Sequence, residues 1–189
     1  MIAGLLLAAG ASRRFGSQKL LAPIGGVPVV RRAAEQLIAA SLDEILIVLG
    51  SDADAIRGAL DGLSLRIVTN ADFATGMSTS VRAGLAALPP TIEAVVIALA
   101  DQPTVGPGIV DRLVQHFRVH RSPIVAPLYR GDVRGNPVLF DRSLFDELRD
   151  VTGDEGGRAV VARDPARVAL VRFDEEMPAD IDVPADLPE

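Results

Sequence analysis

The chain has 189 residues, of which 49% are hydrophobic and 23% charged, and its formal net charge at pH 7 is −6. This length fits one domain with its own core over residues 1–189, and the acidity and scarcity of aromatic residues argue against a nucleic-acid-binding or anionic-membrane surface. The absence of cysteine excludes disulfides, thiolate metal sites and cysteine nucleophiles, and it agrees with a cytoplasmic location.

The first apolar run, residues 2–8, is continuous, which is typical of a strand buried on both faces of a sheet. No apolar run in the chain reaches the ~20 residues that a membrane span needs. The cations follow this first run, whereas a signal peptide carries them before it. We therefore interpret the run as a buried first strand.

Short apolar runs and helical patterns alternate along the first 120 residues. After residue 122 the pattern is less regular and ends in an acidic tail. The alternation predicts an α/β fold with three layers (α/β/α) and a Rossmann-like, mainly parallel sheet. Further strands are expected at 44–49, 65–69, 94–100, 123–128, 137–140 and 168–173, and helices at 29–40, 52–60, 78–88, 108–118, 144–148 and 157–162.

A glycine-rich segment, Leu7–Lys19, follows the first strand directly. Glycine and small side chains at the carboxyl end of a parallel strand let backbone N–H groups approach phosphates, and Arg14 and Lys19 can neutralise phosphate oxygens. The segment matches neither the G-x-x-x-x-G-K-[ST] loop nor the G-x-G-x-x-G fingerprint. The alternative is a plain strand-to-helix turn with solvated cations.

Asp101 stands at the end of the strand expected at 94–100, followed by Gln102 and Pro103. Mg²⁺ typically takes one or two carboxylates together with phosphate oxygens and waters. If the first three strands run outward in the order 3-2-1 and the fourth lies beside the first, the glycine-rich segment and Asp101 face one crevice. The alternative for Asp101 is a helix N-cap or a loop position.

The order Leu-Ala-Ala-Gly-x-Ser-x-Arg-x-Gly-x-x-Lys in residues 7–19 resembles the N-terminal signature of the MobA-like nucleotidyltransferases, closest to their molybdenum cofactor cytidylyltransferase branch. Lys19 followed by Leu20 and Leu21 also matches that branch, whereas Gln18 stands where methylerythritol cytidylyltransferases usually carry proline. In this superfamily the Leu-Ala-Ala-Gly form accompanies CTP and a Leu-Ala-Gly-Gly form accompanies GTP. The resemblance therefore makes Ala9 the residue that favours cytidine.

The resemblance implies a nucleotide-diphospho-sugar transferase type of fold, with the nucleotide bound in the N-terminal half and the acceptor in the C-terminal half. It makes Asp101 a Mg²⁺ ligand. The segment 180–187 resembles an Asp-Ile-Asp-Thr-Pro-Glu-Asp-Leu motif whose middle aspartate is Asp182, a second metal ligand, although Val183 and Ala185 depart from that pattern. The alternative is a solvated acidic tail.

Residues 70–85 resemble the second motif of the family, in which Ser80 and its neighbours lie near the ribose and base; otherwise Ser78 is simply a helix N-cap. Residues 134–140 and 153–158 resemble acceptor segments, with turn chemistry as the alternative: Gly135, Gly156 and Gly157 would serve positive φ. The expected catalytic residues are Lys19, Arg14 and Asp101. Nucleotide-binding residues are expected at Leu7, Ala8, Ala9, Gly10, Ser12, Arg14, Lys19, Asn70 and Ser80, and acceptor-binding residues at Gln102, Arg134, Asn136 and Arg158.

The resemblance implies an in-line attack of an acceptor phosphate on the α-phosphorus of CTP, with release of pyrophosphate. The implied acceptor is molybdopterin, and a molybdoenzyme client would receive the product. The attacking phosphate is already an anion, so no general base is needed. Two alternatives remain: relatives named nicotine blue oxidoreductases or molybdenum-hydroxylase accessory proteins, and a binding protein without catalysis. The absence of a dinucleotide fingerprint argues against NAD(P)H binding. The presence of Lys19 and Asp101 argues against a binding protein without catalysis.

Overall fold

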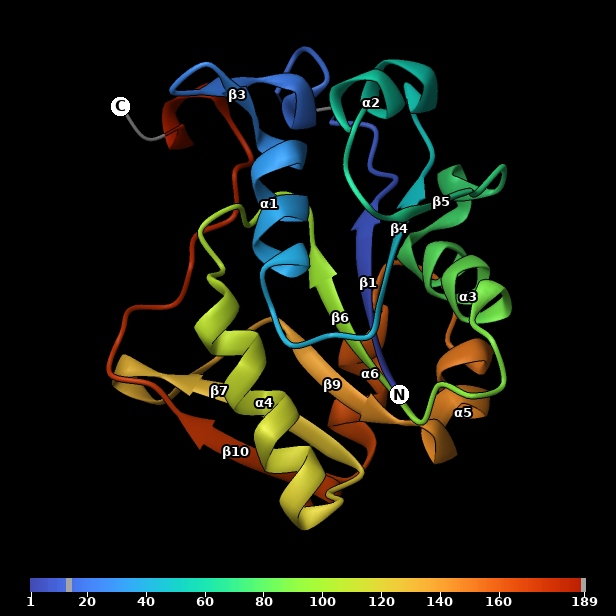
Figure 1. Cartoon of the computed structure of the whole chain (residues 1–189), viewed down its shortest axis with the longest axis vertical. Coiled ribbons are helices and arrows are strands. Elements are labelled where there is room, and N and C mark those ends of the chain that lie inside the picture. The colour runs from blue at the N-terminus through green and yellow to red at the C-terminus, as the bar shows by residue number, and fades with distance from the viewer. Residues whose placement is uncertain (13–14, 188–189) are drawn as a thin grey trace.

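The computed structural model describes residues 1–12 and 15–187. One mixed sheet has the strand order β10-β7-β9-β6-β1-β4-β5, with β8 paired to β7 (Figure 1). Its strands are β1 (Ile2–Ala8), β4 (Glu44–Leu49), β5 (Arg66–Thr69), β6 (Ala94–Leu99), β7 (Ile124–Tyr129), β8 (Val133–Arg134), β9 (Val138–Asp141) and β10 (Val168–Arg172). The helices are α1 (Val29–Ile38), α2 (Ala53–Ala59), α3 (Met77–Ala87), α4 (Pro107–His120), α5 (Phe145–Asp150) and α6 (Gly157–Arg163).

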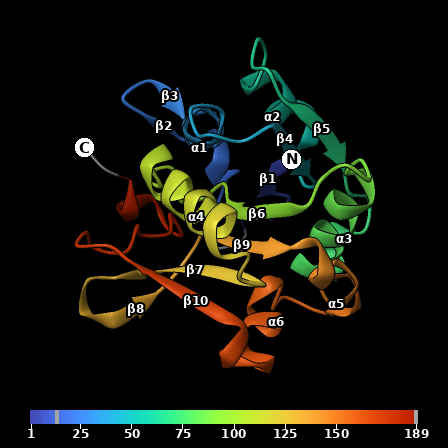
Figure 2. The ribbon, with the colours of Figure 1, turned by 60° about the horizontal axis from the view of Figure 1, so that its bottom comes forward.

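Two helical layers cover the sheet. Helices α1, α2 and α4 pack on one face, and α3, α5 and α6 pack on the other (Figure 2). Strand β1 lies in the middle, and successive side chains of a strand point to opposite faces. Accordingly Ile2, Leu6 and Ala8 join one core, while Leu5 and Leu7 join the other. The continuous apolar run of β1 thus serves two cores, as the sequence predicts, and the expected three-layer α/β/α fold is confirmed.

The order of the first four major strands is also confirmed. β5, β4, β1 and β6 are neighbours in that order, and all three pairings are parallel. Their carboxyl ends therefore meet at one edge of the sheet, at the top of Figure 1. The switch in strand order beside β1 is the place where open α/β sheets bind ligands.

The second half of the sheet is less regular, as the sequence predicts, but it contains an inserted antiparallel strand whose place the sequence did not predict. β9 lies between β6 and β7 and runs antiparallel to both, whereas β10 pairs parallel with β7. A short hairpin of β2 (Pro23–Ile24) and β3 (Val27–Pro28) precedes α1, turned by Gly25 and Gly26, both with positive φ. Two-residue strands leave no periodicity, so only the Gly-Gly turn signal marks this hairpin in the sequence. Within the described residues, no helix is long and apolar enough to cross a bilayer.

Candidate functional site

The glycine-rich segment leaves the carboxyl end of β1 and leads to a short 3₁₀ helix, η1 (Lys19–Leu21). Ser12 holds the turn together. Its hydroxyl donates to Gln18 Oε1 at 2.7 Å and accepts from the backbone N–H of Lys19 at 3.1 Å, while its own φ is +49°. A non-glycine residue in this region is uncommon and is often found at functional sites. Ser12 therefore ties the start of the loop to Gln18 and Lys19 at its end. Arg14 lies outside the described residues.

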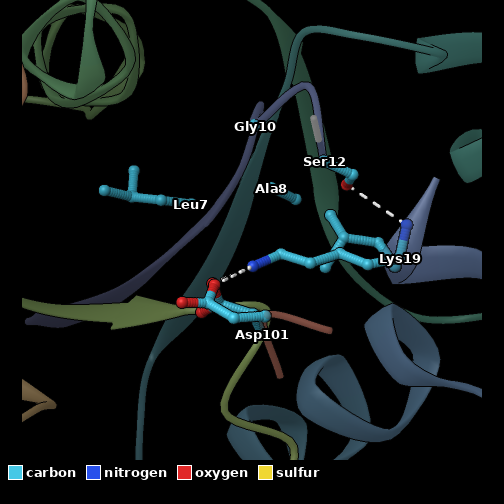
Figure 3. Close-up of a pocket in the computed structure, with 8 residues that line it drawn as sticks. Leu7, Ala8, Gly10, Ser12, Lys19 and Asp101 are labelled. Atoms are coloured by element: carbon cyan, nitrogen blue, oxygen red, sulfur yellow. Dashed lines mark hydrogen bonds and ion pairs between the residues drawn. The ribbon is translucent and has the colours of Figure 1, made fainter. Parts of the chain in front are cut away.

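The side chain of Lys19 crosses the crevice to two carboxylates. Its Nζ lies 2.7 Å from Asp101 Oδ2 and 3.1 Å from Asp182 Oδ1 (Figure 3 shows the contact with Asp101). Burial opposes the charged form of Lys19, but the hydrogen bonds and charges of Asp101 and Asp182 outweigh it and raise the pKa of Lys19. The ammonium is therefore charged at neutral pH and balances two negative groups from distant parts of the chain.

This arrangement suits a divalent cation. Asp101 Oδ1 is buried and has no hydrogen-bond partner among the described residues, so one strong acceptor is left over. Asp101 lies in the turn after β6, and α4 begins six residues later behind Gly106, so Asp101 is not the N-cap of that helix. The described residues contain no cluster of three or more His, Cys, Asp or Glu side chains suited to a metal. Two carboxylates plus ligand oxygens and waters are, however, the set that Mg²⁺ prefers.

Asp182 reaches the site because the C-terminal segment returns over the carboxyl edge of the sheet. The backbone N–H of Ile181 donates to the carbonyl oxygen of Asp101 at 2.9 Å, and Ile181 is buried. The backbone N–H groups of Asp182 and Val183 both donate to Asp186 Oδ2 at 2.8 Å, which lowers the pKa of Asp186. These contacts hold residues 181–183 beside Asp101, although residues 183–186 remain exposed.

Gln102 and Asp180 join the same segment. Gln102 is 4% exposed, and its Nε2 donates to Asp180 Oδ1 at 2.6 Å. Asp180 is exposed, yet partial desolvation of its carboxyl raises its pKa. The hydrogen bond from Gln102 opposes this shift, and the charges of Asp101 and Asp182 add to it. The side chain of Gln102 therefore faces the tail.

The first cavity of the crevice, about 180 Å³, lies directly at these charges. It is lined by Leu7, Ala8, Gly10, Ser12, Lys19, Leu20, Asp101 and Asp182. Seven of these eight residues are among the expected nucleotide or metal residues, and Leu20 is the exception. The structure therefore brings the glycine-rich segment and both aspartates to one cavity.

A second cavity, about 470 Å³, continues past the glycine-rich segment towards α3. Ala9, Gly10 and Ser12 line one side, and Phe73 and Ser80 line the other. It shares Leu7, Gly10, Ser12 and Asp101 with the first cavity, so the two form one cleft. Phe73 was not among the expected site residues, and its place in the 70–85 segment was the signal that could have indicated it.

Asn70 supports this cavity from behind. It is 5% exposed, and its Nδ2 donates to Thr79 Oγ1 at 2.8 Å and to Ser80 Oγ at 3.0 Å. Its Oδ1 accepts from the backbone N–H of Asp72 at 3.0 Å. These contacts occupy the amide, and Asn70 does not line the cavity. The structure therefore places Asn70 as a support for Ser80, which does line it.

The start of α3 is held by the loop before α6. Gly76, with φ +123°, occupies the N-cap position, so the alternative of Ser78 as N-cap is wrong. The backbone N–H of Met77 donates to Asp154 Oδ1 at 3.2 Å, and that of Ser78 donates to the carbonyl oxygen of Gly153 at 3.0 Å. Asp154 lines both the second cavity and the next one. It lies in the 153–158 segment that resembles an acceptor motif, but it was not among the expected site residues.

A third cavity, about 220 Å³, lies over β6, β7 and β9. Arg134, Asn136 and Arg158 line it, as expected for an acceptor site, over an apolar floor that includes Leu99 and Phe140. Gln102 is not among its lining residues. The structure thus brings three of the four expected acceptor residues together and places the fourth elsewhere.

The glycines beside this cavity serve close packing more than turn geometry. Gly156 has a φ of +50°, as expected, but Gly135 and Gly157 do not have positive φ. A Cβ on Gly135 would lie 2.8 Å from the sulfur of Met177, and one on Gly157 would lie 2.8 Å from Phe140 Cζ. The positive φ of the turn alternative is therefore wrong at these two positions. A side chain at Gly157 would collide with buried Phe140, and one at Gly135 would have to displace the exposed Met177 side chain.

Tyr129 supports the Asn136 segment from below. Its hydroxyl donates to the carbonyl oxygen of Asn136 at 2.6 Å. Burial, and to a lesser degree the charge of Glu175, raises the pKa of Tyr129 far above its usual range. Tyr129 therefore stays neutral and acts as a fixed donor under the acceptor cavity.

Comparison with known proteins identifies the family of the chain. A family profile described as a MobA-like NTP transferase domain matches residues 4–168. The chain is 36% identical over 181 residues to nicotine blue oxidoreductase of Paenarthrobacter nicotinovorans, which covers 93% of this chain and 88% of that protein. It is 31% identical over 164 residues to molybdenum cofactor guanylyltransferase of Mesorhizobium japonicum, covering 84% and 76%.

Solved structures give the same picture. The manganese complex of Rv0371C from Mycobacterium tuberculosis superposes with a TM-score of 0.84 at 30% identity, covering 98% of this chain and 95% of that one. The 4-diphosphocytidyl-2C-methyl-D-erythritol synthase of Anaerococcus prevotii has a TM-score of 0.78 at 17% identity, covering 99% and 92%. The latter likeness concerns the fold alone, and it confirms the expected nucleotide-diphospho-sugar transferase type.

Proposed function

The chain belongs to the MobA-like NTP transferase family, and we propose that it is a Mg²⁺-dependent nucleotidyltransferase that uses CTP and a phosphorylated acceptor of the molybdopterin type. The observation that carries the proposal is the ammonium of Lys19, held between Asp101 and Asp182 beside the glycine-rich segment. A site that balances cationic and anionic groups in this way suits a triphosphate accompanied by a metal ion. One domain over residues 1–189 would carry both substrates.

In the proposed reaction a phosphate oxygen of the acceptor attacks the α-phosphorus of CTP. The bond from that phosphorus to the bridging oxygen breaks, and pyrophosphate leaves with the electron pair. Asp101 and Asp182 would hold the divalent ion, which supplies Lewis-acid charge to the phosphate oxygens when bound. Lys19, together with Arg14, would bind the departing pyrophosphate, and the acceptor needs no general base because its phosphate is already ionised.

The N-terminal cavities would bind the nucleotide. Backbone groups of residues 7–12 would face the phosphates, and Ser80 would contact the ribose or base in the 470 Å³ cavity. Ala9 lines that cavity, and the Leu-Ala-Ala-Gly form supports CTP over GTP. The guanylyltransferase relative supports the molybdenum cofactor link without supporting the choice of cytidine.

The third cavity would bind the acceptor. Arg134 and Arg158 provide cations for a phosphate, Asn136 provides further polar groups, and the apolar floor suits a ring system. Asp154 lines this cavity and the nucleotide cavity, so the two substrates would meet there. A molybdoenzyme client would receive the product.

Pyrophosphate release tests the proposal. Purified protein is assayed with CTP, GTP, ATP and UTP, each with and without molybdopterin and Mg²⁺, and CTP with molybdopterin should give the fastest release. Asp101→Ala should lower the rate by at least about 100-fold, since a transition-state charge contact is typically worth that much. The matched control is Asp146→Ala, because Asp146 is an exposed aspartate on α5. Undiminished turnover of Asp101→Ala would contradict the mechanism.

A second candidate function rests on the 36% identity to nicotine blue oxidoreductase across 93% of the chain. The named relatives support this reading, or that of an accessory protein on the same fold, better than they support cytidylyl transfer. An absorbance assay of NADH and NADPH oxidation with nicotine blue distinguishes the candidates. Dye reduction without pyrophosphate release would establish the oxidoreductase, and nucleotide binding with neither activity would establish an accessory or binding protein.

A further inference from the structure

Gln102 is a buried polar residue that the proposed reaction does not use. It follows Asp101 directly, yet its side chain turns away from the acceptor cavity. Its Nε2 donates to Asp180 Oδ1 at 2.6 Å and lies 3.5 Å from the carbonyl oxygen of Pro178. Its Oε1 is buried without a hydrogen-bond partner among the described residues. A buried amide in this position requires a structural or functional reason.

We propose that Gln102 is a positioning residue that anchors the C-terminal segment and thereby holds the Asp182 carboxylate opposite Asp101. This inference rests on the proposed function, in which Asp101 and Asp182 share a divalent ion. It replaces the expectation from the sequence that Gln102 contacts the acceptor. The contact that carries it is the hydrogen bond from Gln102 to Asp180, two residues before Asp182.

The tail needs such an anchor because it has little regular structure. After β10 ends at Arg172, the chain runs to the edge of the sheet where the glycine-rich segment lies (Figure 1). Along the described part of this path there is one short 3₁₀ turn, Pro184–Asp186. Few backbone ladder bonds fix such a segment, so its side-chain contacts decide where it lies. A segment of this kind is also the part of a structure that opens most easily.

Besides the direct ion pair between Lys19 and Asp182, three hydrogen bonds of the neighbouring tail residues help to fix the position of Asp182. The hydrogen bond from Gln102 to Asp180 and that from the Ile181 N–H to the carbonyl oxygen of Asp101 precede it. Asp186 fixes the turn that follows. Among these three hydrogen bonds, the one from Gln102 comes from a side chain outside the tail. Its acceptor is the carboxylate of Asp180. Charge-assisted hydrogen bonds are short and strong, in agreement with the 2.6 Å observed.

The same turn after β6 therefore supplies both halves of the site. Asp101 offers its carboxylate to the ion and its carbonyl oxygen to the tail, and Gln102 holds the tail from the adjacent position. A shift of the tail by about 1 Å would move Asp182 out of reach while Asp101 stayed in place. Loss of Gln102 should thus resemble loss of Asp182 and not loss of Asp101.

Mn²⁺ binding to the full chain without nucleotide, measured by electron paramagnetic resonance, tests the proposal. Gln102→Met keeps the volume but removes the donor, and it should weaken Mn²⁺ binding about 10-fold, the lower end of the 10- to 100-fold cost of losing an outer-shell partner. Asp182→Asn should weaken it at least as much, and the double variant should bind no more weakly than Asp182→Asn alone. Gln115→Met, at an exposed position on α4, is the matched control.

Hydrogen exchange at the Ile181 amide gives a readout that does not depend on the metal. Gln102→Met should lower the protection of this amide at least about 10-fold, while amides of β1 keep theirs. If Gln102→Met fails to fold, Asp180→Ala removes the acceptor at an exposed position and should give the same loss at Ile181.

Two outcomes would overturn the proposal. In the first, Gln102→Met weakens Mn²⁺ binding equally in the Asp182→Asn background, or leaves both Mn²⁺ binding and Ile181 protection unchanged. In the second, it raises only the KM for the acceptor, which restores Gln102 as an acceptor contact. If Asp182→Asn binds Mn²⁺ normally while Gln102→Met still exposes Ile181, the metal assignment of the proposed function fails and the anchor remains.

Discussion

Replacing Lys19 by methionine should strengthen metal binding and weaken turnover. Lys19 is the single lysine of the chain, and its ammonium lies 2.7 Å from Asp101 and 3.1 Å from Asp182. In the free protein a divalent ion must displace this ammonium before it can use the same carboxylates. During transfer the ammonium is needed at the phosphates. The two effects of the substitution therefore have opposite signs.

The magnitude follows from the exposure of the three side chains. Lys19 and Asp101 are 12% and 23% exposed, and a hydrogen bond between such charged groups contributes about 1.5–3 kcal/mol. Asp182 is 37% exposed, so its contact contributes less than about 1 kcal/mol because solvent screens it. If displacement costs about 2 kcal/mol, Lys19→Met should bind Mn²⁺ about 30-fold more tightly. Its kcat/KM for the nucleotide should fall about 100- to 1,000-fold.

Electron paramagnetic resonance with Mn²⁺, without nucleotide, measures the affinity, and pyrophosphate release measures the turnover. Arg118→Met is the control because Arg118 is an exposed cation on α4. The raised pKa of Lys19 sets the pH range: the ion pair is fully formed below the ordinary lysine value of 10.5 and is lost as pH rises through the higher folded value. Measurements between pH 7 and pH 9 therefore compare a charged lysine with methionine. Unchanged or weaker Mn²⁺ binding by Lys19→Met would refute the competition, and unchanged turnover would refute the phosphate role.

Three further predictions concern the nucleotide cavity and the outer helices. Ala9→Gly removes one methyl group from the cavity wall. It should raise the ratio of GTP to CTP turnover about 10-fold, since a methylene-sized change is worth about 1–3 kcal/mol. An unchanged ratio in the pyrophosphate assay would show that Ala9 does not determine the choice of base. Asn70→Leu should lower the free energy of unfolding by about 1–3 kcal/mol in urea and raise the KM for the nucleotide, because Ser80 loses a buried donor; a normal KM would show that Ser80 does not depend on it. The hydrogen bonds from Arg167 hold the pKa of Glu147 below its ordinary value of 4.5, so this pair should stabilise the fold above that value and lose its effect as pH falls through the lower folded pKa. Urea unfolding of Glu147→Gln should lack that acid-dependent loss, and identical pH profiles would contradict it.

The regular half of the fold could be predicted because its signals are local. The run of β1 is buried on both faces, so its hydrophobicity is continuous, and the β-α-β rhythm determines parallel neighbours. The Rossmann-like order β5-β4-β1-β6 followed from those rules. The position of β9 did not, because a short strand inserted antiparallel between β6 and β7 depends on long-range packing and carries no periodicity of its own.

The site residues divide in the same way. Residues 7–12 and Asp101 could be placed from the sequence because each follows a strand whose carboxyl end is known. The direction in which a side chain points could not be predicted from the sequence. Gln102 adjoins Asp101 but faces the tail, and Asn70 lies in the right motif but supports Ser80 from behind. Spacing shows which residues lie near one another, whereas rotamers and hydrogen-bond partners decide which of them reach a ligand.

The departures of the tail from the family pattern become intelligible once its hydrogen bonds are known. Val183 stands where the motif that this segment resembles has threonine, yet the turn after Asp182 depends on the backbone N–H of Val183, which donates to Asp186 Oδ2. Any residue other than proline supplies that N–H, so the change to valine leaves the turn intact. Ala185 is exposed. The three aspartates of the pattern, Asp180, Asp182 and Asp186, are all retained, and their carboxylates accept from Gln102, Lys19 and the backbone. The tail therefore keeps the atoms that hold it in place and varies where only a side chain without such a contact is lost.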